Sequence, residues 1–84
     1  MMMSKQIVVD NLTYEVVALV HDNDTEKDYV VFTDGKTNNL KLSCVRYRKE
    51  NKQLIPIKLE TTEEKEAAVE IIKEVMNQLN SNQE

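Results

Sequence analysis

The side chains that could carry out catalysis are few and scattered along this chain. His21 is the only histidine and Cys44 the only cysteine. A histidine can act as general base for a thiol, but these two belong to different expected strands, and no spacing brings them together. A zinc site would need further ligands at metal-binding spacing. We therefore predict no catalytic residue, no metal and no cofactor, and a protein that is not an enzyme.

A short acidic stretch resembles the start of a calcium loop. Asp22, Asp24 and Glu26 alternate there with polar residues. The calcium motif requires glycine at its sixth position and glutamate at its twelfth, where this chain has Lys27 and Thr33. The interpretation is a solvated hairpin loop.

The basic segment CVRYRK, residues 44–49, raises the question of nucleic acid. A ring interleaved with basic residues can stack on bases when ring and charges share a face. Strand alternation instead places Tyr47 on the opposite face from Arg46 and Arg48. The net charge of -4 also opposes attraction to phosphates. A weak association with RNA or the ribosome stays as the alternative function, through the basic edge formed by Arg46, Arg48, Lys49, Lys52 and Lys58.

The elements that must position these residues follow from hydrophobic patterning. Residues 5–9, 14–20, 28–33, 40–48 and 53–59 have the composition of strands, separated by turn-forming residues. Thr61 and Glu64 form a capping-box pattern that starts a helix. An apolar stripe at three- and four-residue spacing follows, made of Ala68, Ile71, Ile72, Val75, Met76 and Leu79. The sequence predicts an α+β fold: a five-stranded antiparallel meander with one C-terminal amphipathic helix packed across one face.

The 84 residues are enough for one domain, with an ordered core over about residues 5–80 and flexible termini. No secretory signal or membrane-spanning stretch is visible. With one unpaired thiol, the expected compartment is the cytoplasm, without contact to a membrane.

Hairpin arithmetic predicts which residues face one another. It places Leu19 opposite Val30 and Val17 opposite Phe32. It also places Phe32 opposite Val45, and Val30 opposite Tyr47. Across the last hairpin, with residues 50–52 at its tip, it pairs Val45 with Ile57 and Tyr47 with Ile55. The expected core face beneath the helix consists of Val17, Leu19, Val30, Phe32, Val45, Tyr47, Ile55, Ile57 and Leu59.

The opposite face of this sheet is also apolar. Its predicted interaction residues are Val16, Ala18, Val20, Tyr29, Val31, Leu40 and Leu42, with Tyr14 and Cys44 nearby. Strong curvature could bury them in a second core, or they could form an interface. The leading hypothesis is a non-enzymatic protein-interaction or regulatory module whose partner is an unknown protein, with a homodimer as one possibility.

Several segments together resemble a known family. They are KQIVVD, YEVVALV, DYVVF and VRYRKENKQLIPI, followed by the acidic helix start ETTEEKE. In this order they resemble the YrzB-like family of small acidic bacterial proteins, a domain of unknown function, over roughly residues 5 to 80. Lys65 stands where that family commonly has a large aromatic residue. The resemblance implies a small cytoplasmic protein and no catalytic residues.

Overall fold

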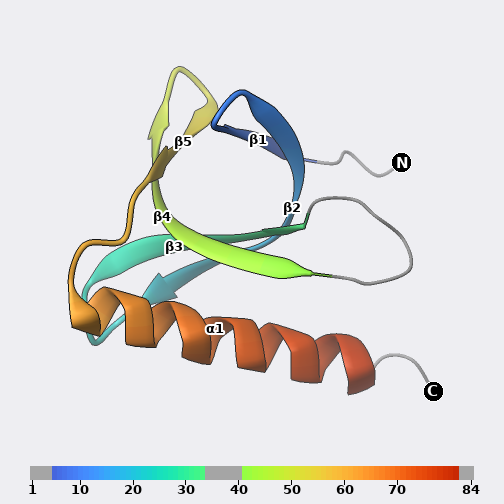
Figure 1. Cartoon of the computed structure of the whole chain (residues 1–84), viewed down its shortest axis with the longest axis vertical. Coiled ribbons are helices and arrows are strands. Elements are labelled where there is room, and N and C mark those ends of the chain that lie inside the picture. The colour runs from blue at the N-terminus through green and yellow to red at the C-terminus, as the bar shows by residue number, and fades with distance from the viewer. Residues whose placement is uncertain (1–4, 34–40, 82–84) are drawn as a thin grey trace.

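The computed structural model describes residues 5–33 and 41–81. Its elements are β1 (Gln6–Val9), β2 (Leu12–Asp22), β3 (Lys27–Thr33), β4 (Leu42–Glu50), β5 (Gln53–Ile57) and α1 (Thr62–Ser81). The strands form one antiparallel sheet in the order β1-β2-β3-β4-β5 (Figure 1). The predicted α+β class, the five-stranded meander and the C-terminal helix are thereby confirmed.

Two of the hairpins are closed by two-residue turns with positive φ. Asp10 and Asn11 connect β1 to β2 with φ of 52° and 67°, and Asn51 and Lys52 connect β4 to β5 with φ of 50° and 67°. Positive φ at both central residues defines a type I′ turn, whose twist matches that of the flanking strands. Asparagine and aspartate tolerate this conformation well, whereas lysine does not.

The register of β2 against β3 is interrupted once. Leu19 pairs with Val30 as predicted, but Val16 rather than Val17 pairs with Phe32, because the register shifts between Val16 and Ala18. The extra residue of a bulge turns the strand locally. Val16 and Ala18 consequently belong to different hydrophobic clusters.

The predicted register of β4 is wrong on both sides. Against β3, Val30 pairs with Val45 instead of Tyr47, a shift of two residues that keeps every side chain on its expected face. Against β5 the shift is one residue, since the turn has two residues instead of the expected three. Tyr47 pairs with Pro56 and Arg48 with Ile55. Ile55 therefore lies on the opposite face from Tyr47.

The two faces of the sheet have exchanged the roles that the sequence predicts for them. Beneath α1 lie Tyr29, Val31 and Cys44, in one cluster with Ala68, Ile71 and Val75. The other face holds Ile7, Val30 and Phe32, against which Val16, Leu19, Val45 and Tyr47 pack. Both faces are thus buried, one by the helix and one by the curl of the sheet (Figure 1).

The curl brings the two ends of the meander together. β1 lies beside β5 at the top of Figure 1. The sheet order nevertheless does not close, because β1 pairs only with β2 and β5 only with β4. Two strand edges therefore face each other across a seam.

Candidate ligand groove between β1 and β5

The predicted interaction face is not open to a partner. Tyr29 and Val31 are both 0% exposed beneath α1. Ala18, Val20 and Leu42 pack around them, whereas Val16 lies inside the curl. Leu40 falls outside the described residues. The sequence predicts a free surface here because it assigns α1 to the opposite face of the sheet. That assignment is wrong, since α1 packs on Tyr29 and Val31.

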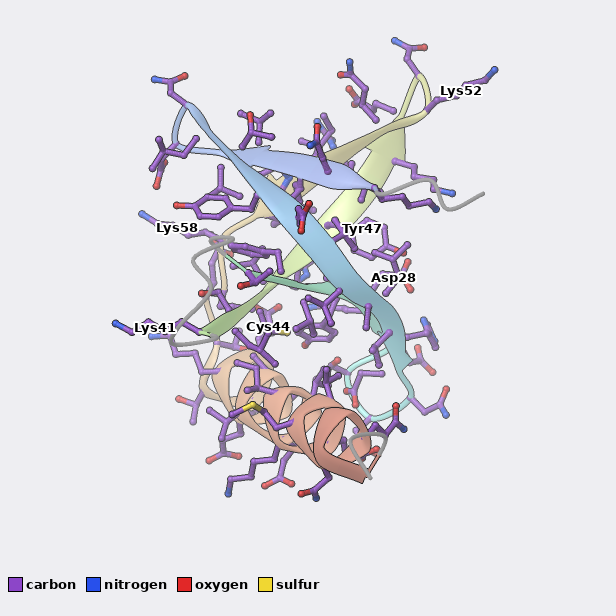
Figure 2. All side chains as sticks on the ribbon, turned by 90° about the vertical axis from the view of Figure 1, so that its right-hand side faces the viewer. Asp28, Lys41, Cys44, Tyr47, Lys52 and Lys58 are labelled. Atoms are coloured by element: carbon purple, nitrogen blue, oxygen red, sulfur yellow. The ribbon has the colours of Figure 1, made fainter. Side chains whose placement is uncertain are left out.

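The predicted basic patch is divided by the structure. Arg46 lies under the start of α1, with Nη1 3.1 Å from Glu64 Oε2, and its side chain is only 22% exposed. Arg48 is exposed and forms an ion pair with Glu50 at 3.1 Å. Lys49 and Lys52 line a groove at the far end of the molecule, and Lys58 is exposed outside it. Figure 2 shows Lys52 at the opposite end of the molecule from α1.

Glu64 gathers the charges that fix the helix start. Its Oε2 accepts hydrogen bonds from Lys27 Nζ at 2.9 Å and from Arg46. Its Oε1 accepts from the amides of Glu60 at 2.8 Å and Thr61 at 3.4 Å. The Glu64 amide in turn donates to Thr61 Oγ1, which confirms the predicted capping box. These donors, the Glu60 amide first and Lys27 second, lower the pKa of Glu64 to about 2.

The acidic loop, the histidine and the thiol have separate surroundings in the structure. Asp22 Oδ2 accepts hydrogen bonds from the amide and hydroxyl of Thr25, and these bonds lower the pKa of Asp22. His21 is exposed and pairs with Asp28 at 2.8 Å. Cys44 is buried, and burial raises the pKa of its thiol to about 12. Within the described ranges, no three His, Cys, Asp or Glu side chains are placed to hold a metal ion.

The hollow that does offer a site is the groove along the seam. It has a volume of about 760 Å³, within the range of ligand sites. Residues from both edge strands and both type I′ hairpins line it: Lys5, Gln6, Val8, Thr13, Lys49, Lys52, Gln53, Leu54, Ile55 and Pro56. Three lysines therefore line the groove together with four apolar residues, and none of these described lining residues is acidic.

Backbone alternation decides which polar groups the groove presents. A two-residue turn hydrogen-bonds the pair that closes it, and hydrogen-bonded and non-hydrogen-bonded pairs then alternate along the hairpin. The 2.9 Å bond from the Val16 amide to the Lys5 carbonyl fits this alternation in the first hairpin. Gln6 and Val8 consequently direct their amides and carbonyls away from β2, toward the seam.

The same count applied to β5 explains its proline. Pro56 stands opposite Tyr47 in a non-hydrogen-bonded pair, three residues after the closing Gln53. Its missing amide hydrogen therefore costs no bond to β4, as expected for a proline on an edge strand. The seam edge of β5 offers only the Leu54 amide as a donor within the strand.

No pattern in the sequence predicts this groove. Lys5, Val8 and Leu54 belong to segments that are distant along the chain, and only the closing curl of the sheet brings them together. The available signal was that both faces of the sheet are apolar, because this favours strong curvature, and curvature brings the two edge strands of a meander together.

A second hollow, of about 580 Å³, lies between α1 and the β2–β3 hairpin. Asp22, Asp24 and Glu74 line it, and Glu63, Glu66 and Glu70 line an adjoining depression. The molecule thus has an acidic side at the helix and a basic groove at the seam.

Comparison with known proteins finds no matching family model, no similar curated protein and no similar solved structure. The resemblance to the YrzB-like family stays a prediction. In the part of the chain that the structure describes, no helix combines the length and the hydropathy needed to cross a membrane.

Proposed function

We propose that this protein is a non-enzymatic interaction module that binds a segment of another protein in the groove between β1 and β5. The observation that carries the proposal is a groove of about 760 Å³ lined by three lysines and by apolar residues of two strands. Concave sites that combine an apolar lining with a few polar groups are typical of ligand binding.

The lining of the groove supports a binding role over catalysis. Its described side chains are lysines, glutamines, one threonine and apolar residues. A nucleophile oriented by a base, or a pair of carboxylates, would be needed for most hydrolytic chemistry. Neither occurs among these residues.

A protein ligand fits the groove better than RNA does. Single-stranded RNA is held by aromatic side chains that stack on bases, and no aromatic residue is among those that line the groove. Arg46 and Arg48 of the predicted basic patch are engaged with Glu64 and Glu50. The apolar residues Val8, Leu54 and Pro56 instead suit side chains of a peptide.

Site-specific photocrosslinking in cells tests this function. A benzophenone amino acid replaces Val8, which lines the groove and is 54% exposed. The matched control replaces Val69 on α1, which is 51% exposed and does not line it. We expect discrete protein adducts at Val8 that disappear when Lys49 and Lys52 are changed to glutamate, and no such adducts at Val69.

Three results would contradict the proposal. The first is an equal yield of adducts at Val8 and at Val69. The second is adducts that nuclease treatment removes, because these would favour the alternative of an RNA-associated factor. The third is an adduct of two copies of the chain, which would replace the partner by self-association. We propose that the protein is cytoplasmic, and the crosslinking is therefore carried out on chain expressed in the cytoplasm of the host.

A further inference from the structure

We propose that the ligand of the groove is an extended acidic segment that lies along the groove with its carboxylates against Lys5, Lys49 and Lys52. This inference rests on the proposed function and names the chemistry of its partner. It joins two observations: the three lysines that line the groove and the apolar residues beside them.

The charges select an acidic ligand. Lys5 precedes β1, whereas Lys49 and Lys52 belong to the β4–β5 hairpin, so lysines line the groove on both sides. None of the described lining residues offsets them. Exposed lysine–carboxylate pairs are individually weak, about two- to fivefold in Kd each. Three together supply selectivity, and the acidic side at α1 repels the same ligand from the rest of the molecule.

The turn geometry gives independent support. Lys52 occupies the second central position of a type I′ turn with φ of 67°, where glycine is strongly preferred. A lysine there is strained. The residue that occupies this strained position is one of those that line the groove.

The apolar lining and the narrow seam decide how the ligand lies. β1 and β5 are too close together for a further strand to pair between them, so the ligand rests along the groove outside the sheet. β5 contributes an apolar wall of Leu54, Ile55 and Pro56. Along an extended ligand, alternate side chains share one face. Carboxylates at every second position can then meet the lysines while the residues between them face the opposite side.

The test is a titration of the full chain, labelled with ¹⁵N, with a seven-residue peptide that alternates glutamate and valine. A matched peptide has glutamine in place of glutamate. A short oligouridylate tests the nucleic-acid source of negative charge. We expect amide shifts at Gln6 and Val8, at least tenfold weaker binding of the glutamine peptide, and no comparable binding of RNA.

Matched lysine variants locate the charge effect. Lys49→Ala combined with Lys52→Ala should weaken the acidic peptide by about tenfold. Lys41→Ala combined with Lys58→Ala makes the same change of net charge at exposed positions that do not line the groove and should leave Kd within about twofold (Figure 2). Thermal unfolding of each variant checks that it is folded.

The inference is overturned if the glutamine peptide binds equally, if the shifts map to α1, if both lysine pairs have equal effects, or if the RNA binds as tightly as the peptide. Its failure is distinguishable from failure of the proposed function. Protein adducts at Val8 with no binding of the acidic peptide would leave an interaction module with a different ligand. Absence of those adducts would contradict the proposed function itself.

Discussion

Glu64 is the residue on which the docking of the helix depends. It is 2% exposed, yet its carboxylate is surrounded by donors from β3, β4 and the helix start. A buried charge is tolerated only when it is paired and hydrogen-bonded. The capping-box part of this arrangement could be predicted from Thr61 and Glu64. The pairing with Lys27 and Arg46 could not, because it depends on which face of the sheet α1 covers.

Acid should destabilise the protein through this carboxylate. The pKa of Glu64 falls from 4.5 to about 2 on folding, so its contribution is fully present above about pH 4.5 and is lost as pH falls toward 2. In Glu64→Gln this part of the pH dependence should vanish, and Lys27 and Arg46 lose their partner. The midpoint of thermal unfolding at pH 7 should drop by at least about 5 °C.

Circular dichroism of thermal unfolding between pH 2 and 7 measures this effect. Glu63→Gln is the control, because Glu63 is exposed in the same helical turn and has none of these hydrogen bonds among the described contacts. Identical pH profiles for wild type and Glu64→Gln would show that the cluster does not stabilise the fold.

Cys44 should be chemically inert in the folded protein. It is 6% exposed in the cluster beneath α1 (Figure 2). Burial raises the pKa of its thiol from 9.0 to about 12, and only the thiolate reacts. At pH 8 we expect disulfide-exchange labelling at least about 100-fold slower than in urea-unfolded chain, whose thiol has an ordinary pKa. Labelling at the unfolded rate in native buffer would mean that α1 does not cover this face.

At the scale of elements, the sequence predicted the existence of each strand and of the helix but not their alignment. The Asn51–Lys52 turn lacks the glycine that marks a type I′ hairpin. The sequence therefore predicts a three-residue tip, and the predicted register of β5 is wrong by one residue. The bulge at Val17 likewise has no glycine to mark it. Register errors of one residue exchange faces, and this is why Ile55 was placed in the wrong layer.

The strained turn yields a prediction in which stability and binding diverge. Lys52→Gly should relieve about 1–2 kcal/mol of left-handed strain and add roughly 0.5–1 kcal/mol of chain entropy to the unfolded state. The net gain is about 0.5–1 kcal/mol in urea unfolding. The same variant should bind the acidic peptide about two- to fivefold more weakly.

Glu26→Gly is the matched control for that experiment. Glu26 has φ of 58° in the β2–β3 loop and does not line the groove. It should gain similar stability with unchanged peptide affinity. If both variants bind the acidic peptide with equal affinity, Lys52 does not contribute to the binding site.

At the scale of the whole molecule, one sheet builds two cores. Alternation predicts which residues share a face, but with both faces apolar it does not decide which one the helix covers. The curl settles this: the face of Val30 and Phe32 packs on itself, and the face of Tyr29 and Val31 is left for α1. The predicted interaction face is therefore genuinely apolar, and its occupant belongs to the same chain.

Removing that occupant should recreate an exposed apolar surface. A chain ending at Glu60 loses the cover over Tyr29, Val31 and Cys44 and also loses Glu64. A patch of this kind drives association, and a 60-residue remainder is marginally stable. We expect the shortened chain to bind a hydrophobic dye and to sediment as aggregates, while the full chain sediments as a 9.8 kDa monomer at all concentrations.

The control for the truncation is Met76→Asp, because Met76 is 41% exposed on α1 and tests whether the outer side of the helix contributes. That variant should stay monomeric and folded, because its side chain is not part of the cluster beneath the helix. A full chain that dimerises and is returned to monomer by Met76→Asp would place a self-association surface on the outside of α1. A shortened chain that remains a folded monomer would mean that the curled sheet is stable alone, and that the helix is an accessory to the fold.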